Sequence, residues 1–140
     1  QYDNLSLHQI EQTFDIFIEG WAFGHSITDY PNNTYEITKR LIIQASGLLN
    51  PGGITCFIET LGTNTERPQP PNKLLALFYN ILEENYGFEK VIVDTSYRFK
   101  NNREAQKVMG FFFGKEMEAS VKATGGPIIP EWTGIWYRKG

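Results

Sequence analysis

Two glutamates stand at matching places in the chain, and their spacing points to paired-carboxylate chemistry. The tripeptide Phe-Ile-Glu occurs at residues 17–19 and 57–59, and each copy closes a short apolar run. If these runs are neighbouring strands in register, about 4.8 Å apart, Glu19 and Glu59 lie close enough to raise the pKa of one carboxyl, which then accepts a proton near neutral pH. The alternative is that both carboxylates cap neighbouring helix N-termini or form surface ion pairs.

The loop after the first glutamate has residues that suit a ligand. Residues 20–25 read Gly-Trp-Ala-Phe-Gly-His. Glycines allow close backbone approach, and the aromatic faces of Trp21 and Phe23 attract a cation. His25, whose unperturbed pKa lies near 6.5, is a candidate base beside Glu19. The alternative is that Trp21 and Phe23 are ordinary core aromatics.

Two buried strands must position these carboxylates. The runs 14–18 and 54–58 are almost unbroken apolar stretches, which are typical of strands buried on both faces of a parallel sheet. Ligands of open α/β sheets bind outside the carboxyl ends of the strands. The sequence therefore predicts a ligand site at the shared edge where Glu19 and Glu59 stand.

The rest of the chain alternates between helical and strand patterns. The further predicted elements are helices over 37–49, 74–82 and 101–119 and strands over 88–98 and 132–138. Asn72 is a plausible helix cap, and Asn101 with Glu104 resembles a capping box. Strands that alternate with helices predict one α/β domain over residues 1–140, a three-layer sandwich with a mostly parallel sheet.

Composition narrows the class of partner. The 140 residues carry a net charge of -3 without a Lys/Arg cluster, which argues against a nucleic-acid groove. No apolar stretch approaches the roughly 20 residues of a membrane span, and the polar start at Gln1 is not a secretory signal. One cysteine, Cys56, fits a reducing cytoplasmic setting. His8, His25 and Cys56 lack the paired spacing of metal ligands, so no metal site is predicted.

Several segments, in this order, resemble class I S-adenosylmethionine-dependent methyltransferases. Residues 14–21 with 49–53 (Leu-Asn-Pro-Gly-Gly) and 54–59 look like the fourth strand, helix and fifth strand of that family. Residues 86–98, 111–114 and 130–136 resemble the C-terminal strands of its small-molecule members. The resemblance implies a Rossmann-like fold, S-adenosylmethionine as cofactor and methyl transfer to a small-molecule acceptor.

The resemblance also implies roles for residues. It places Glu19, Gly20, Trp21, Ala22 and Phe23 against the cofactor, and residues 2–5 look like the end of the segment that passes the adenine. Glu19 and His25 become the catalytic candidates, and the substrate-binding set is Trp21, His25, Glu59, Tyr97 and Trp136.

The family's glycine-rich loop and the acidic residue of its second strand have no counterpart in this sequence. We therefore expect the C-terminal half of a methyltransferase fold, with the N-terminal strands missing and with no activity on its own. The other hypothesis is a non-catalytic α/β module. The strand at 14–18 would then be an exposed edge that pairs with another chain or forms a homodimer.

Overall fold

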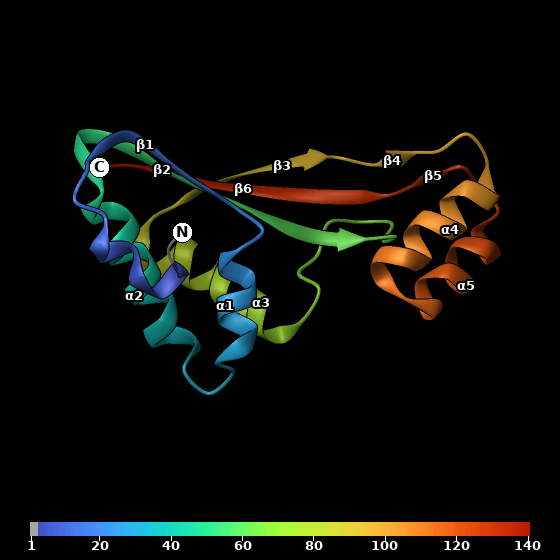
Figure 1. Cartoon of the computed structure of the whole chain (residues 1–140), viewed down its shortest axis with the longest axis horizontal. Coiled ribbons are helices and arrows are strands. Elements are labelled where there is room, and N and C mark those ends of the chain that lie inside the picture. The colour runs from blue at the N-terminus through green and yellow to red at the C-terminus, as the bar shows by residue number, and fades with distance from the viewer. Residues whose placement is uncertain (1–2) are drawn as a thin grey trace.

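The computed structural model describes residues 3–140 as a sheet with helices on one face and a helical hairpin at one end (Figure 1). The main sheet contains β1 (Phe14–Gly20), β2 (Leu49–Thr63), β3 (Glu89–Asp94) and β6 (Glu131–Lys139), and a small sheet pairs β4 (Tyr97–Arg98) with β5 (Ile128–Ile129). The helices are η1 (Asn4–Gln9), α1 (Phe23–Asp29), α2 (Thr34–Gly47), α3 (Lys73–Asn80), η2 (Ile81–Asn85), α4 (Asn102–Phe113) and α5 (Lys115–Thr124). The predictions for Gln1 and Tyr2, a polar start and the first residue of an adenine-facing segment, lie outside the described residues.

The main sheet has the order β1-β2-β6-β3. β1 and β2 are parallel, with Glu19 opposite Phe57, whereas β6 runs antiparallel to both β2 and β3. Three strands therefore point the same way, and β6 is reversed between two of them. The predicted α/β class is confirmed. The predicted mostly parallel sheet is confirmed only for the β1–β2 pairing, because the β2–β6 and β6–β3 pairings are antiparallel.

One face of the sheet is covered and the other is open. Helices α1, α2 and α3 lie together on one face (Figure 1), and β2 buries Phe57 and Leu61 toward them. On the opposite face of β1, Ile16 and Ile18 are 56% and 63% exposed. The prediction that the 14–18 run is buried on both faces is thus wrong within residues 3–140, and the predicted third layer is not confirmed. The alternation of β1 still places every second side chain, including Glu19, inside.

Six aromatic side chains belong to the core between the sheet and the helices. Phe57 stacks on Phe88 with ring centroids 5.1 Å apart, and Tyr79 stacks on Trp136 at 4.3 Å. Phe57 and Trp136 have no exposed surface. Because buried aromatic residues contribute about 150–250 Å² each, this group stabilises the position of β2 between β1 and β6.

Helix caps follow the sequence closely. The Asn72 side chain accepts a hydrogen bond from the Leu75 amide at 2.9 Å, so the predicted cap is confirmed. Asn101 accepts from the Glu104 amide at 3.0 Å, and the Glu104 carboxylate in turn accepts from the Lys100 amide at 2.7 Å. This reciprocal pair resembles a capping box, except that the Glu104 carboxylate binds the amide of Lys100, one residue before the cap, instead of the amide of Asn101.

Three predicted boundaries differ from the structure. The predicted helix 101–119 is two helices, because Gly114 adopts φ 87° between α4 and α5. The predicted strand 88–98 is divided into β3 and β4, which belong to different sheets. The helix predicted over 37–49 ends at Gly47, and residues 49–53 lie inside β2. There Gly53 is required, because a Cβ at this position would lie 2.9 Å from the Asp15 carbonyl oxygen.

Candidate functional site

The carboxyl ends of β1 and β2 place two buried glutamates at one edge of the sheet. Glu19 is 6% exposed and Glu59 is 2% exposed, and both face the helical layer. Because Glu19 is opposite Phe57, Glu59 lies two residues further along the neighbouring strand rather than directly across from Glu19. The two carboxyl groups therefore share a face and an edge but not a register position.

Both carboxyl groups bind the first turn of α1. Glu19 Oε1 accepts hydrogen bonds from the amides of Ala22 and Phe23, the latter at 2.9 Å, and Glu59 Oε1 accepts from the Gly24 amide at 2.7 Å. α1 has no side-chain cap from its own N-cap residue, so these carboxyls satisfy amides that would otherwise lack partners. Helix capping, the alternative considered from the sequence, is what the geometry shows for both residues.

Burial changes the protonation of this pair. Burial first, and the nearby Glu19 carboxyl second, raise the pKa of Glu59 to about 8, against the hydrogen bond from Gly24. Burial also raises the pKa of Glu19, although the two α1 amides oppose the shift. At neutral pH Glu59 is therefore mostly protonated. Among the described residues none donates a hydrogen bond to Glu19 Oε2, which is buried.

Trp21 stands at the turn between β1 and α1 in an unusual conformation. Its φ is 54°, a left-handed value that is an outlier for a bulky residue, and its side chain is 53% exposed. The Trp21 amide donates to the Ile58 carbonyl at 2.8 Å, which fixes this turn to β2. Strained residues of this kind cluster at functional sites, so the conformation supports a ligand-binding role for Trp21.

A pocket of about 360 Å³ opens beside Trp21. Five elements or their ends contribute to it, and its lining residues are Trp21, Thr60, Thr63, Tyr97, Phe113 and Glu131. By strand alternation Thr60 faces away from the helical layer, opposite to Glu59. We call this cavity the strand-end pocket. Its size lies at the small end of the range for ligand sites.

Among residues 3–140, Glu131 is the only charged side chain that lines the strand-end pocket. Glu131 is 7% exposed, and its Oε1 lies 3.5 Å from the donating hydroxyl of Thr60. Its Oε2 is buried and receives no hydrogen bond from any residue between 3 and 140. Burial raises the pKa of Glu131, against hydrogen bonds from Thr63 and Thr60.

The structure brings together only part of the predicted substrate set. Trp21 and Tyr97 line the strand-end pocket, whereas Glu59 lies on the other face of β2. His25 is exposed on α1 and does not line this pocket. Trp136 is buried in the core, where its Nε1 donates to Glu83 at 2.9 Å and its ring borders a separate cavity of about 280 Å³.

Four lining residues were not predicted from the sequence. Thr60 and Thr63 extend β2 beyond its predicted end, and Glu131 begins β6 one residue before the predicted strand. Phe113 closes the aromatic run 111–113, which is the one signal that could have drawn attention to it. The others come from distant segments and have no local signature.

The loop at 20–24 also meets the N-terminal segment. The Asn4 amide donates to the Ala22 carbonyl and to the Ser26 hydroxyl, both at 3.1 Å. Residues 3–5, which the resemblance assigns to the adenine segment, therefore lie beside the cofactor-binding residues that it assigns. A Cβ built on Gly20 would meet nothing within 4 Å, so the backbone there is open to a ligand.

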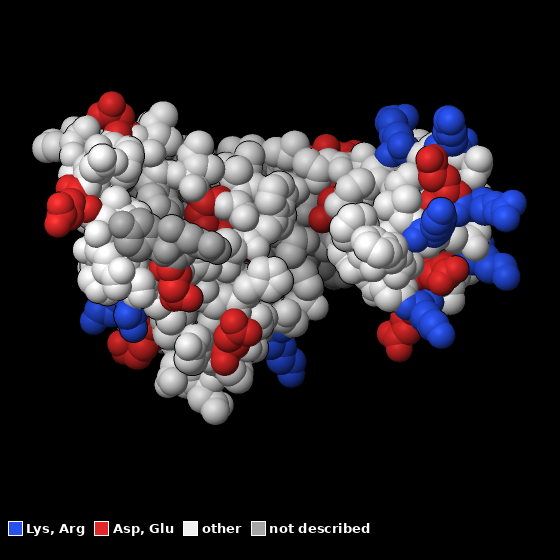
Figure 2. Space-filling view, in the orientation of Figure 1, with Lys and Arg blue, Asp and Glu red and all other residues white. Residues whose placement is uncertain are grey.

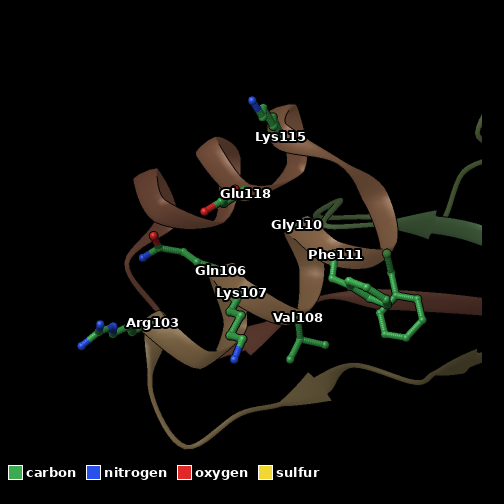
Figure 3. A pocket seen from close by; sticks show the side chains of 9 residues that line it. Arg103, Gln106, Lys107, Val108, Gly110, Phe111, Lys115 and Glu118 are labelled. Carbon is green, nitrogen blue, oxygen red and sulfur yellow. The ribbon is translucent and has the colours of Figure 1, made fainter.

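A larger groove of about 700 Å³ lies between α4 and α5. Arg103, Lys107 and Lys115 line it, and in Figure 3 their side chains point away from one another. Figure 2 shows Lys and Arg gathered over this end of the molecule, interspersed with acidic residues, a grouping in space that sequence analysis did not foresee. All three cations are exposed. We call this cavity the hairpin groove.

Residues 3–140 contain no group of three or more His, Cys, Asp or Glu side chains arranged to hold a metal ion. No helix in this range combines the length and the apolar character needed to cross a membrane.

Comparison with known proteins gives a distant structural likeness. No family model matches the chain, and no curated protein matches it. Among solved structures, the chain is similar to a protein from Bacillus halodurans C-125 described as a "putative methyltransferase". The two are 15% identical with a TM-score of 0.48, over 99% of this chain and 69% of the other. At this distance the likeness establishes no shared activity.

Proposed function

We propose that this chain forms part of an enzyme that transfers a methyl group from S-adenosylmethionine to a small-molecule acceptor. One observation carries the proposal. The two strands that resemble the family's fourth and fifth strands are neighbours and parallel, and they end together at an edge with an aromatic pocket and buried carboxyls. Ligand sites of α/β sheets lie at such edges.

The residues at this edge fit one side of the cofactor. Gly20 leaves open space, Trp21 offers an exposed ring, and Asn4 lies within hydrogen-bond distance of Ala22. The chemistry that bound S-adenosylmethionine supplies is a methyl group on a positively charged sulfur. Aromatic faces and carboxylates favour a cation of this kind. The glycine-rich loop has no counterpart here, so this chain supplies the contacts of residues 19–23 rather than a complete cofactor site.

The chain's own residues would act mainly by positioning. Glu19 and Glu59 hold the first turn of α1 and thereby fix the loop at 20–24. Such fixed geometry accounts for much of the acceleration of an in-line transfer. The predicted base Glu19 has a carboxyl oxygen, Oε2, that receives no hydrogen bond from residues 3–140, but this side chain faces the helical layer and does not line the strand-end pocket. His25, exposed on α1, is the alternative base.

Nuclear magnetic resonance tests the proposal even for weak binding. S-adenosylmethionine is titrated to millimolar concentration into the uniformly ¹⁵N-labelled chain, with ATP as a control that shares only the adenosine part. We expect S-adenosylmethionine to shift the amide signals of residues 20–24, and Trp21→Ala to abolish the shifts while the exposed-site variant Glu116→Gln retains them. The absence of shifts, or equal shifts with ATP, contradicts the proposal.

A second candidate function is self-association through β1. β1 is an edge strand of the described sheet, and Ile16 and Ile18 are exposed on it. Unpaired apolar edges invite strand pairing. Light scattering on the same sample measures the mass. A dimer that Ile18→Lys converts to monomer, together with no response to S-adenosylmethionine, would favour this function, whereas a monomer contradicts it.

A further inference from the structure

The strand-end pocket contains a buried carboxyl with unused hydrogen-bonding capacity. Glu131 is 7% exposed, its Oε1 has a long contact of 3.5 Å with Thr60, and its Oε2 receives no hydrogen bond from residues 3–140. Buried polar atoms in native proteins are nearly always paired, so an unpaired oxygen at the wall of a pocket indicates a missing donor. A ligand with N–H groups would supply that donor.

The other walls of the pocket favour a positively charged, partly apolar ligand. Trp21, Tyr97 and Phe113 present three aromatic rings around the same cavity. A cation over an aromatic face is attracted by the ring electrons, most strongly when water is excluded. Phe113 comes from the end of α4, whereas Trp21 follows β1, so the rings approach the cavity from two parts of the fold.

No Lys or Arg side chain of the described residues 3–140 lines the strand-end pocket. The one ion pair that the structure describes between residues 3 and 140 joins Lys90 to Glu83, away from the pocket lining. Burial raises the pKa of Glu131, as expected for a carboxyl without a partner of opposite charge. An arriving ammonium group would provide that charge and favour the ionised carboxylate.

We propose that the strand-end pocket binds the protonated amino group of a small aromatic or apolar amine, with Glu131 as its counter-charge and Trp21, Tyr97 and Phe113 around its apolar body. The identification of this amine as the methyl acceptor rests on the proposed function, whereas the binding itself does not. Glu131 is a binding residue in this assignment, and Trp21 contributes to both the cofactor side and the amine side of the turn.

A pair of probes that differ in one group isolates the charge. 2-Phenylethylamine is protonated at pH 7, and 2-phenylethanol has the same skeleton with a neutral hydroxyl. Both are titrated into the ¹⁵N-labelled chain, and dissociation constants are taken from the shifts. We expect the amine to bind about tenfold or more tightly than the alcohol, the size of a charge-assisted hydrogen bond. Shifts should centre on residues 21, 60, 97, 113 and 131.

Variants separate charge from shape. Glu131→Gln should weaken the binding of the amine about tenfold, to the affinity of the alcohol, and should leave the affinity of the alcohol unchanged. Trp21→Ala should weaken the binding of both ligands. The control variant Glu116→Gln, which removes an exposed carboxyl on α5, should change the dissociation constant of neither ligand. If Glu131→Gln loses the dispersed spectrum of a folded protein, Thr60→Val, which removes a hydroxyl near Glu131, replaces it, and amine selectivity should change.

Each outcome decides the assignment. Equal binding of amine and alcohol, no binding of either at millimolar concentration, or shifts centred on the hairpin groove overturns it. Amine selectivity without any response to S-adenosylmethionine supports the pocket and contradicts the proposed methyl transfer. A response to S-adenosylmethionine without amine selectivity supports the proposed methyl transfer and contradicts the amine pocket. The two proposals can therefore fail separately.

Discussion

Charged side chains are buried at the sheet edge where β1 and β2 end, and they are exposed on the α4–α5 hairpin. At the edge, Glu19, Glu59 and Glu131 are each less than a tenth exposed, and each has a raised pKa. On the hairpin, the cationic side chains of Arg103 and Lys107 are exposed to solvent. Charged side chains are therefore buried in the first region and solvated in the second.

The difference shows where charge points to function. An exposed charge is solvated and costs little, so a mixed group such as the one on the hairpin needs no partner. A buried carboxyl must be held by donors or remain protonated, and this requirement is met only in part at the edge. For that reason the smaller strand-end pocket is a better candidate for a ligand site than the larger hairpin groove.

The largest expected contrast between the two regions is in packing. Phe57 is fully buried, and Phe111 is 82% exposed on α4. Phe57→Ala should lower the free energy of unfolding by about 3–5 kcal/mol, because it leaves a cavity among aromatic rings. Phe111→Ala should change it by less than about 0.5 kcal/mol. Urea unfolding of both variants measures the contrast, and similar losses would show that the hairpin ring is buried in solution.

The next contrast concerns pH. The pKa of Glu59 is about 8 in the fold and 4.5 ordinarily, so between these values the folded state holds a proton that the unfolded chain has released. The free energy of unfolding should therefore fall as pH rises through this window, by up to about 1.4 kcal/mol per pH unit. Glu59→Gln keeps an oxygen for the Gly24 amide but does not titrate. This variant should flatten the slope.

The control for this test lies on the hairpin. Glu116 is exposed, so Glu116→Gln should leave the slope unchanged. The raised pKa of Glu19 has the same sign as that of Glu59, so some slope should remain in Glu59→Gln. An unaltered slope in Glu59→Gln would mean that its carboxyl is ionised and hydrated at neutral pH, and the two regions would no longer differ in this respect.

Helix caps should contribute equally to the free energy of unfolding in the two regions. Asn72 accepts from its capped amide at 2.9 Å and Asn101 at 3.0 Å, although one begins α3 in the body and the other begins α4. Asn→Ala at either position should cost about 1 kcal/mol in urea unfolding, and Asn→Asp should cost little. A normal loss for Asn72→Ala with none for Asn101→Ala would show that the hairpin unfolds separately from the body.

Much of the fold could be predicted because its signals are local. The apolar run 14–18, the helical stripe within α2 and the cap at Asn72 each appear within a short window of sequence. α1 was missed because it has only seven residues and its first turn is held by carboxyls, one of them Glu59, 35 residues from the amide that it binds. Likewise, Leu49 and Ile54 pair with β1 on either side of residues 50–53, so these four residues lie within β2 as an irregularity although their Pro and Gly residues favour a turn.

The candidate site could be predicted only at its first strand end. Glu19 and Trp21 were chosen as candidates because they directly follow a strong strand pattern. In the structure Glu19 is buried and Trp21 has a left-handed backbone conformation. Glu131 and Phe113 lie far away in sequence, and only the arrangement of β6 and the hairpin brings them to the pocket. The paired-carboxylate hypothesis placed Glu59 at the same edge as Glu19, and in the structure both side chains face the helical layer, on the side of β2 opposite to the strand-end pocket.

The smallest expected effect tests whether the two regions are electrically independent. Lys107 lines the hairpin groove but not the strand-end pocket, and its side chain is exposed. At 0.15 M salt the Debye length is about 8 Å, so Lys107→Glu should change the dissociation constant of 2-phenylethylamine by less than about twofold. The free energy of unfolding should change by less than about 0.5 kcal/mol. At 0.01 M salt, where the length is about 30 Å, the variant should bind the amine more tightly, because the repelling cation has become an anion. A several-fold change in the dissociation constant that persists at 0.15 M salt would show that the hairpin cations act directly on the pocket. The acidic pocket and the basic hairpin would then form one continuous charged surface rather than two independent regions.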